Sequence, residues 1–251
     1  MDNNQYRPTG FKVLPVVVKN ILIINGLFFL ATLGIGKAFQ IDISSYLGLH
    51  YFQSESFKPY QFITYLFMHA DFWHIFFNMF ALWMFGNVLE NVWGPKRFLV
   101  YYIITGIGAA LVQMLVYYIQ ISNLEAVMTQ DQINLVLVDG LKYIGEGKNF
   151  LNPAMGELNL LLNSTTVGAS GAVFGILLAF GMMFPNSLIY VYFAIPVKAK
   201  WFVVFYGAME LYSGFANNPA DNVAHFAHLG GMLFGFFLII YWNKKLKGKY
   251  F

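Results

Sequence analysis

Long uncharged segments dominate the pattern of polar and apolar positions along the chain. Six of them have the length of membrane-spanning helices: residues 21–36, 72–89, 98–124, about 168–185, 201–215 and 222–243. The fourth belongs to a longer uncharged run, 158–197, which Pro185 and Asn186 interrupt where a turn should fall. The fifth contains one acid, Glu210. Because a bilayer core needs roughly 20 mostly apolar residues per helix, the pattern predicts an all-α, polytopic membrane protein with six transmembrane helices.

The composition excludes several classes of protein. Hydrophobic residues make up 58% of the chain and charged residues 11%, whereas soluble domains carry about 25% charged residues. A soluble enzyme and a disordered protein are therefore excluded. The net charge of +3 is too small to indicate binding to nucleic acid. Since the chain has no cysteine, disulfides, zinc–thiolate sites and a cysteine nucleophile are excluded as well.

Lysine and arginine are unevenly distributed over the segments between the apolar runs. With the N-terminus inside, the cytoplasmic set is Arg7, Lys12, Lys19, Lys96, Arg97, Lys198, Lys200, Lys244, Lys245, Lys247 and Lys249. The outer set is only Lys37, Lys58, Lys142 and Lys148. Because basic loops stay inside, we expect both termini in the cytoplasm. Residues 1–10 are polar and resemble neither a signal peptide nor a transit peptide, so we expect a bacterial inner membrane.

A long outer loop, about 120–167, separates the third and fourth runs. We expect it to be an extension of a single membrane domain that covers residues 1–251. Apolar residues recur in it on one helical face: Ile133, Val136, Leu137, Leu141 and Ile144. This pattern predicts a short amphipathic helix on the outer leaflet; the alternative is a substrate-binding element.

Three polar clusters lie in or at the ends of the apolar runs, where polar groups are costly and are functional candidates by default. The first is His74 with Asn78, which are four residues apart and share one helical face. An imidazole and a carboxamide so placed offer two N–H donors toward one point, as an oxyanion hole requires. The alternative is that each side chain simply bonds to a neighbouring helix.

The second cluster surrounds Ser170. Gly168, Gly171 and the alanines between and beside them leave backbone N–H groups accessible at the start of a span. Such groups have no acceptor within the helix and could bind a developing oxyanion. Two structural alternatives remain: a serine bonded back to a carbonyl of the preceding turn, and a helix-packing contact through Gly171 and Gly175.

The third cluster is His225 and His228 in the sixth run. Gly231 and Gly235 follow His228 at positions +3 and +7, so His228 could approach a neighbouring helix closely and accept a serine proton. A metal site at the two histidines is the competing idea. We expect no metal, because the fourth and sixth runs contain neither Asp nor Glu. We expect Glu210 to pair with a hydroxyl group.

These clusters resemble the rhomboid family of intramembrane serine proteases. The resemblance rests on four segments in the family's order: 60–79 with His74 and Asn78, 90–98 with Glu90, Gly94 and Arg97, 168–175 with Ser170, and 227–235 with His228. It implies a six-helix rhomboid-like bundle without a cofactor. Where some members have tyrosine four residues after the serine, this chain has Phe174, whose ring can still pack on His228.

The resemblance also implies a role for each residue. Ser170 would be the nucleophile and His228 the general base, in a dyad that has no carboxylate nearby. His74, Asn78 and the Ser170 N–H would bind the oxyanion. The structural residues would be Gly168, Gly171, Phe174, Gly231 and Gly235 near the site, with Glu90, Gly94 and Arg97 at the turn between the second and third spans.

The implied reaction is cleavage of transmembrane segments of membrane proteins within the lipid bilayer, through an acyl-enzyme, with loop 216–222 as a cap over the site. Two alternatives come from other classes. One is a non-catalytic member of the same fold that binds membrane helices. The other is a small transporter or channel, which would need charged residues along a path through the membrane, whereas Glu210 is the one acid in the six runs.

Overall fold

The computed structural model describes residues 10–191, 194–216 and 223–247, and the fold is mostly helical. The helices are α1 (Val16–Phe39), α2 (Ile43–Leu47), α3 (Gln61–Thr64), η1 (Tyr65–Phe67), α4 (Phe72–Ala81), η2 (Leu82–Gly86), α5 (Asn87–Trp93), α6 (Pro95–Glu125), α7 (Gln130–Gly145), α8 (Pro153–Asn163), α9 (Ser170–Met183), α10 (Ala199–Ala216) and α11 (His225–Lys247). Two strands, β1 (Leu188–Val191) and β2 (Ile195–Lys198), form an antiparallel hairpin between α9 and α10.

Four helical segments of the described chain are long and apolar enough to cross a membrane. They are α1, the continuous segment α4–η2–α5, α6, and α11 as far as Asn243. Helix α9 has 14 residues and is apolar. At 1.5 Å per residue it is about 21 Å long, shorter than the roughly 30 Å of a hydrocarbon core. In a bilayer, at least one end of α9 therefore lies below the surface.

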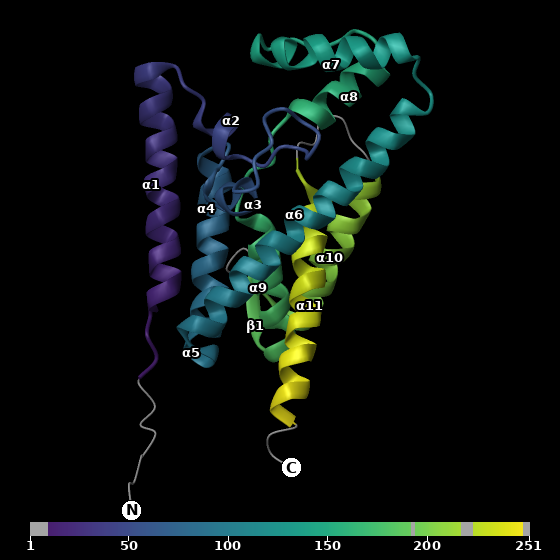
Figure 1. The fold of residues 1–251 in the computed structure, drawn as a ribbon. Helices are drawn as coiled ribbons and strands as arrows, with labels where there is room; N and C mark the ends of the chain where they lie inside the picture. The colour runs from purple at the N-terminus through teal and green to yellow at the C-terminus, as the bar shows by residue number, and fades with distance from the viewer. Residues whose placement is uncertain (1–9, 192–193, 217–222, 248–251) are drawn as a thin grey trace, which may run out of the picture.

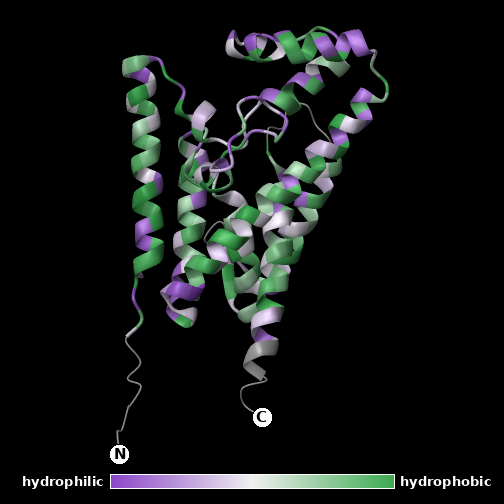
Figure 2. Cartoon of the chain, in the orientation of Figure 1, coloured by the Kyte–Doolittle hydropathy of each residue, from purple (hydrophilic) through white to green (hydrophobic). Residues whose placement is uncertain are grey.

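The long helices form a bundle with a covered interior. Helix α1 stands at one edge, α6 slants across the bundle, and α9 lies inside it next to α11 (Figure 1). Helices α7 and α8 lie across one end, and the start of α1 and the end of α11 lie at the opposite end (Figure 1). Apolar residues cover the middle of the helices, while polar residues gather on α7 and at the end of α5 (Figure 2).

The prediction of a purely helical chain was wrong in one segment. After the turn at Pro185 and Asn186, residues 188–191 and 195–198 form the two strands β1 and β2, in which Ile189 is paired with Val197. This segment is rich in β-branched and aromatic residues, which favour strands. Its lack of charge made it indistinguishable from the neighbouring helices by hydropathy alone.

The segment between α6 and α9 holds two helices. Helix α7 occupies the amphipathic segment, and a capping box between Thr129 and Gln132 closes its start. Val136 on its apolar face is fully buried, and the helix packs on α8. Helix α8 was not foreseen. It begins with the N-cap Asn152 and with Pro153 in its first turn, which are standard start signals for a helix.

Glu90 holds the first helix against the second. The Glu90 carboxylate, in a side chain that is only 3% exposed, accepts hydrogen bonds from the backbone N–H groups of Val17 at 2.9 Å and Val18 at 2.8 Å. These are groups of the first turn of α1, which have no acceptor within their own helix. A carboxylate there also interacts favourably with the positive end of the helix dipole.

Glu90, Gly94 and Arg97 were expected to stabilise the turn between the second and third spans, and this expectation is only partly correct. The Gly94 N–H does donate to the Glu90 carbonyl at 2.8 Å, and Gly94 has a φ of +80°, which favours glycine. The side chains of Glu90 and Arg97, however, contact other helices. The Glu90 carboxylate caps α1, and the Arg97 guanidinium lies 5.2 Å from the ring centre of Trp242 on α11.

Glycines let α9 and α11 meet at backbone distance. A Cβ at Gly231 would collide with the carbonyl group of Gly171, so the two helices touch through their main chains at this point. Gly235, which was expected to face the same neighbour, instead lies against the Tyr101 hydroxyl of α6. That hydroxyl donates to the Gly175 carbonyl at 2.8 Å, so α6 also fastens α9.

We expect Glu90→Gln to lower the free energy of unfolding by about 1–3 kcal/mol, because the amide leaves one N–H of α1 without an acceptor. Thermal unfolding of the purified protein in detergent micelles measures this. The matched control is Glu146→Gln, which removes an exposed ion pair with Lys148 and should cost about 0–1 kcal/mol. Equal effects of the two substitutions would contradict the capping role of Glu90.

We expect Gly231→Ala to destabilise the bundle by about 1–3 kcal/mol, the usual cost of overpacking, because the added methyl group pushes α11 away from Gly171. Gly34→Ala on α1 is the control, since a Cβ there meets nothing within 4 Å. It should be neutral or slightly stabilising through helix propensity. The same unfolding assay compares both variants, and a harmless Gly231→Ala would show that the two helices are not in close contact.

Candidate active site

Ser170 is the first residue of α9, at the end of an extended segment that enters the bundle from the side of α7 and α8. Backbone hydrogen bonds between Leu49 and Thr166, at 2.9 and 2.8 Å, guide this segment. The Gly168 N–H then donates to the Tyr65 carbonyl at 3.0 Å. The backbone that positions Ser170 is thus tied to two other segments of the chain.

Gly168 can only be glycine in this arrangement. Its φ is +123°, which L side chains rarely adopt, and a Cβ there would lie 2.6 Å from Nε2 of His74 and 3.7 Å from Oγ of Ser170. The His74 ring therefore lies directly over the backbone that leads to the serine. A Cβ at Gly168 would be close to both the His74 ring and the Ser170 hydroxyl, so the Gly168 backbone forms the floor of the site between these two side chains.

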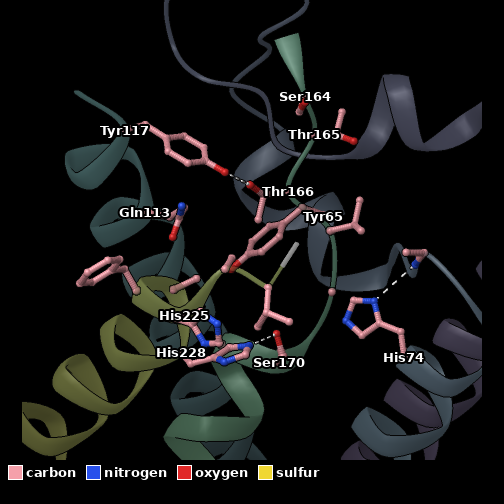
Figure 3. Close-up of a pocket in the computed structure, with 18 of the residues that line it drawn as sticks. Tyr65, His74, Gln113, Tyr117, Ser164, Thr165, Thr166, Ser170, His225 and His228 are labelled. Atoms are coloured by element: carbon pink, nitrogen blue, oxygen red, sulfur yellow. Dashed lines mark hydrogen bonds between the residues drawn. The ribbon is translucent and has the colours of Figure 1, made fainter. Parts of the chain in front are cut away.

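His228 and Ser170 are in direct contact. His228 Nε2 lies 2.8 Å from Ser170 Oγ, and the two side chains face each other from α11 and α9 (Figure 3). The ring of Phe174, one turn after the serine, stacks on the His228 ring with centroids 4.2 Å apart and planes 7° apart. Phe174 thereby fixes the plane of the imidazole without a tyrosine hydroxyl.

His74 and Asn78 line the same cavity as Ser170. The Ala70 N–H lies 3.4 Å from His74 Nδ1, an arrangement in which Nδ1 accepts and a neutral ring carries its hydrogen on Nε2, the atom next to Gly168. Asn78 Nδ2 donates one hydrogen to the His74 carbonyl at 2.9 Å. A carboxamide has two such hydrogens, so the second is free to serve a ligand.

A second histidine next to His74 stays uncharged. His69, in the loop before α4, is 3% exposed, and its ring centre lies 5.0 Å from that of His74. Burial, reinforced by the neighbouring His74, lowers the pKa of His69 to about 3. At neutral pH His69 therefore fills space beside His74 without adding a charge.

The site lies where three helices begin. Helices α4, α9 and α11 start at residues 72, 170 and 225, and each contributes to one open cavity of about 1910 Å³. The N-terminal end of a helix carries a partial positive charge and unpaired N–H groups. The cavity extends from Ser170 to residues of α7, α8 and the segment after α1, such as Leu141, Glu157 and Ser45. It therefore joins the serine to the polar end of the molecule.

The expectation that no acid lies near the site was wrong. Glu210 on α10 turns inward, and its Oε2 lies 2.8 Å from Nδ1 of His228 and 2.7 Å from Nδ1 of His225. Among the described residues, its hydrogen-bond partners are thus two histidines and not a hydroxyl group. The signal was present in the sequence, because a single acid in an apolar span is a functional candidate by default. What hydropathy did not reveal is which neighbouring helix it faces.

The same three residues form a set of metal-ligand type. The ligand atoms of Glu210, His225 and His228 all lie within 4.8 Å of one another. The contacts of 2.7 and 2.8 Å to the carboxylate, however, are hydrogen-bond distances. Ligands around one tetrahedral zinc ion, each about 2.1 Å from the metal, stand further apart than that. The geometry thus fits shared protons better than a shared ion.

Taken together, the side chains can support nucleophilic attack on a carbonyl group. A hydroxyl bonded to an imidazole can be deprotonated as it attacks. N–H donors from His74, Asn78 and the start of α9 can stabilise the negative oxygen that results. Of the loop expected to cap the site, residues 217–222 lie outside the described part of the chain.

The chain is similar in sequence to rhomboid proteins. The family model for the rhomboid domain matches residues 56–245. The chain is 26% identical over 169 residues to the mitochondrial Rhomboid protein 1 of Saccharomyces cerevisiae, covering 67% of this chain and 38% of that protein. It is 29% identical over 177 residues to the rhomboid protease AarA of Providencia stuartii, covering 67% of this chain and 50% of that protein.

A chloroplastic Rhomboid-like protein 11 of Arabidopsis thaliana is 36% identical over 93 residues, 33% of each chain. The chain thus spans half or less of the length of each of these relatives. The rhomboid match, by contrast, covers well over half of this chain and includes α4 to α6, α9, α10 and most of α11. The chain belongs to the rhomboid family, whose domain is a polytopic membrane bundle.

Proposed function

We propose that this protein is an intramembrane serine endopeptidase that cleaves transmembrane segments of membrane proteins. Ser170 is the nucleophile and His228 the general base. His74, Asn78 and the Ser170 N–H stabilise the oxyanion. The observation that carries the proposal is the 2.8 Å contact between Ser170 Oγ and His228 Nε2, at the partly buried start of α9 and inside a cavity large enough for a peptide.

The reaction follows from these contacts. Ser170 Oγ attacks the carbonyl carbon of the scissile peptide as its proton passes to His228 Nε2. The tetrahedral oxyanion is held by the N–H donors of the site. His228 then returns the proton to the leaving amine, and an acyl-enzyme remains on Ser170. Water, which reaches Ser170 through the cavity, hydrolyses the ester by the same proton transfers in reverse order.

The position of the site favours a substrate that comes from lipid. Helix α9 is too short to reach both surfaces of a bilayer, so at least one of its ends is submerged, and in this proposal that end is the one that begins with Ser170. In this proposal α9 and α10 complete a bundle of six spans with four longer segments, both termini are cytoplasmic, and the host is a bacterial inner membrane. Gly168 and the His74 ring close the floor of the site, which favours small residues at the cleavage position.

We expect Ser170→Ala to abolish cleavage of a single-span model substrate while its thermal unfolding stays like that of the parent. A fluorophosphonate probe should label the parent and not the variant, because the probe reacts with an activated serine. Ser122→Ala is the control, since the Ser122 hydroxyl bonds to the Tyr118 carbonyl of its own helix.

The result decides between two classes of function. If Ser170→Ala cleaves as fast as the parent, the protease proposal is wrong. If the parent binds membrane helices but neither cleaves them nor reacts with the probe, the protein is a non-catalytic binder of the same fold.

We expect Asn78→Ala to lower kcat roughly 100-fold with little change in KM, because an oxyanion donor acts mainly in the transition state. Steady-state cleavage of the model substrate measures both constants. Asn134→Ala, an exposed position on α7, should leave them unchanged. An Asn78→Ala enzyme with normal kcat would remove Asn78 from the oxyanion site.

A further inference from the structure

Glu210 contacts the edge of His228 that is opposite to the serine. Its Oε2 lies 2.8 Å from Nδ1, while Nε2 of the same ring lies 2.8 Å from Ser170 Oγ. Both side chains are largely buried, 13% exposed for Glu210 and 8% for His228. The carboxylate, the imidazole and the hydroxyl therefore form one continuous chain of hydrogen bonds from α10 through α11 to α9.

We propose that Glu210 is a positioning residue that turns the Ser170–His228 pair into a triad. This inference rests on the proposed protease function. A neutral imidazole carries a hydrogen on one of its two nitrogens, and an ionised carboxylate can only accept hydrogen bonds. The carboxylate at Nδ1 therefore keeps the hydrogen on that nitrogen and leaves the lone pair of Nε2 directed at the Ser170 hydroxyl.

The proton transfers balance without a proton on Glu210. The Ser170 proton moves to Nε2 as the Oγ–C bond forms, which makes His228 a cation. The carboxylate beside Nδ1 stabilises this cation, and the proton then leaves Nε2 with the departing amine. Glu210 remains ionised throughout and touches neither the substrate nor the reacting atoms.

The carboxylate is itself held in place. His225 Nδ1 lies 2.7 Å from the same Oε2, and His225 and His228 are three residues apart on one face of α11. Two donors on one oxygen orient the carboxylate toward α11. Phe174 restrains the face of the His228 ring at 4.2 Å. The imidazole is thus fixed at both nitrogens and over its plane.

The surroundings leave Glu210 with these partners. Helix α9, which packs against α10, presents Ser170 here and has no titratable side chain. His74 faces the site from α4, on the far side of Ser170 (Figure 3). A carboxylate in an apolar span costs free energy. Hydrogen bonds to two histidines next to the nucleophile offset part of that cost.

The test is Glu210→Gln in the full-length protein. This substitution keeps the shape but lets the amide donate to Nδ1, which favours the wrong tautomer of His228. We expect kcat for the model substrate to fall roughly 100-fold or more with KM nearly unchanged, within the range of general base catalysis. The fluorophosphonate probe should still label Ser170, but more slowly. Glu125→Gln, at the exposed end of α6, is the matched control and should not change either constant.

The outcomes separate this inference from the proposed function. If the parent cleaves and Ser170→Ala does not, but Glu210→Gln keeps kcat within about threefold of the parent, the triad is refuted and the protease stands. If EDTA abolishes activity of the parent, the three side chains hold a metal and the triad is also refuted. If the parent neither cleaves nor is labelled, the protease proposal itself fails.

A second measurement covers the case in which Glu210→Gln does not fold. Nitrogen-15 NMR of histidine-labelled parent, at a pH where the rings are neutral, reports the tautomer of each histidine. The His228 signals are identified by their loss in His228→Gln. The triad requires the tautomer with hydrogen on Nδ1, and a His228 ring with hydrogen on Nε2 overturns it.

Discussion

The backbone contact between α9 and α11 sets the distance on which the site depends. Gly231 lies against the carbonyl of Gly171, so that no side chain separates the two helices. Close to this contact, the same spacing leaves Ser170 Oγ and His228 Nε2 2.8 Å apart. A hydrogen bond loses strength quickly as its length grows, so the packing of two glycines determines whether the serine and the histidine act as one unit.

Several buried polar groups connect segments that are distant in sequence. The Tyr101 hydroxyl donates to the Gly175 carbonyl at 2.8 Å, and the Tyr65 hydroxyl donates to the Gly106 carbonyl at 2.7 Å. Glu90 closes the start of α1 from α5. In a membrane such groups cannot form hydrogen bonds with water, so they must find their partners within the protein. The same pairs that satisfy them therefore hold α1, α6 and α9 in their places around the site.

Hydropathy and spacing predicted the parts of this arrangement that depend on one segment alone. The uncharged runs located the four long spans, and the small residues around Ser170 marked the start of a helix. Neighbours across the bundle could not be predicted in the same way. Gly235 faces Tyr101 and not α9, and Glu210 faces two histidines, because the rotation of each helix is set by packing and leaves no trace in hydropathy. The β1–β2 hairpin was missed because an uncharged run does not reveal its backbone conformation. Helix α8 was missed although Asn152 and Pro153 are start signals for a helix.

In the proposed protease reaction, the charges around Ser170 favour the separation of charge that attack on the carbonyl group brings about. Attack creates a negative oxygen and a positive imidazole on either side of the serine. The starts of α4 and α9, with their positive dipole ends, are on the side of the oxyanion, together with the N–H donors. Helix α11 also begins at the site, however, and its positive end at His225 opposes a charge on His228. A carboxylate at Nδ1 offsets that opposition, which gives a physical reason for one acid within the otherwise uncharged run 201–215 of α10.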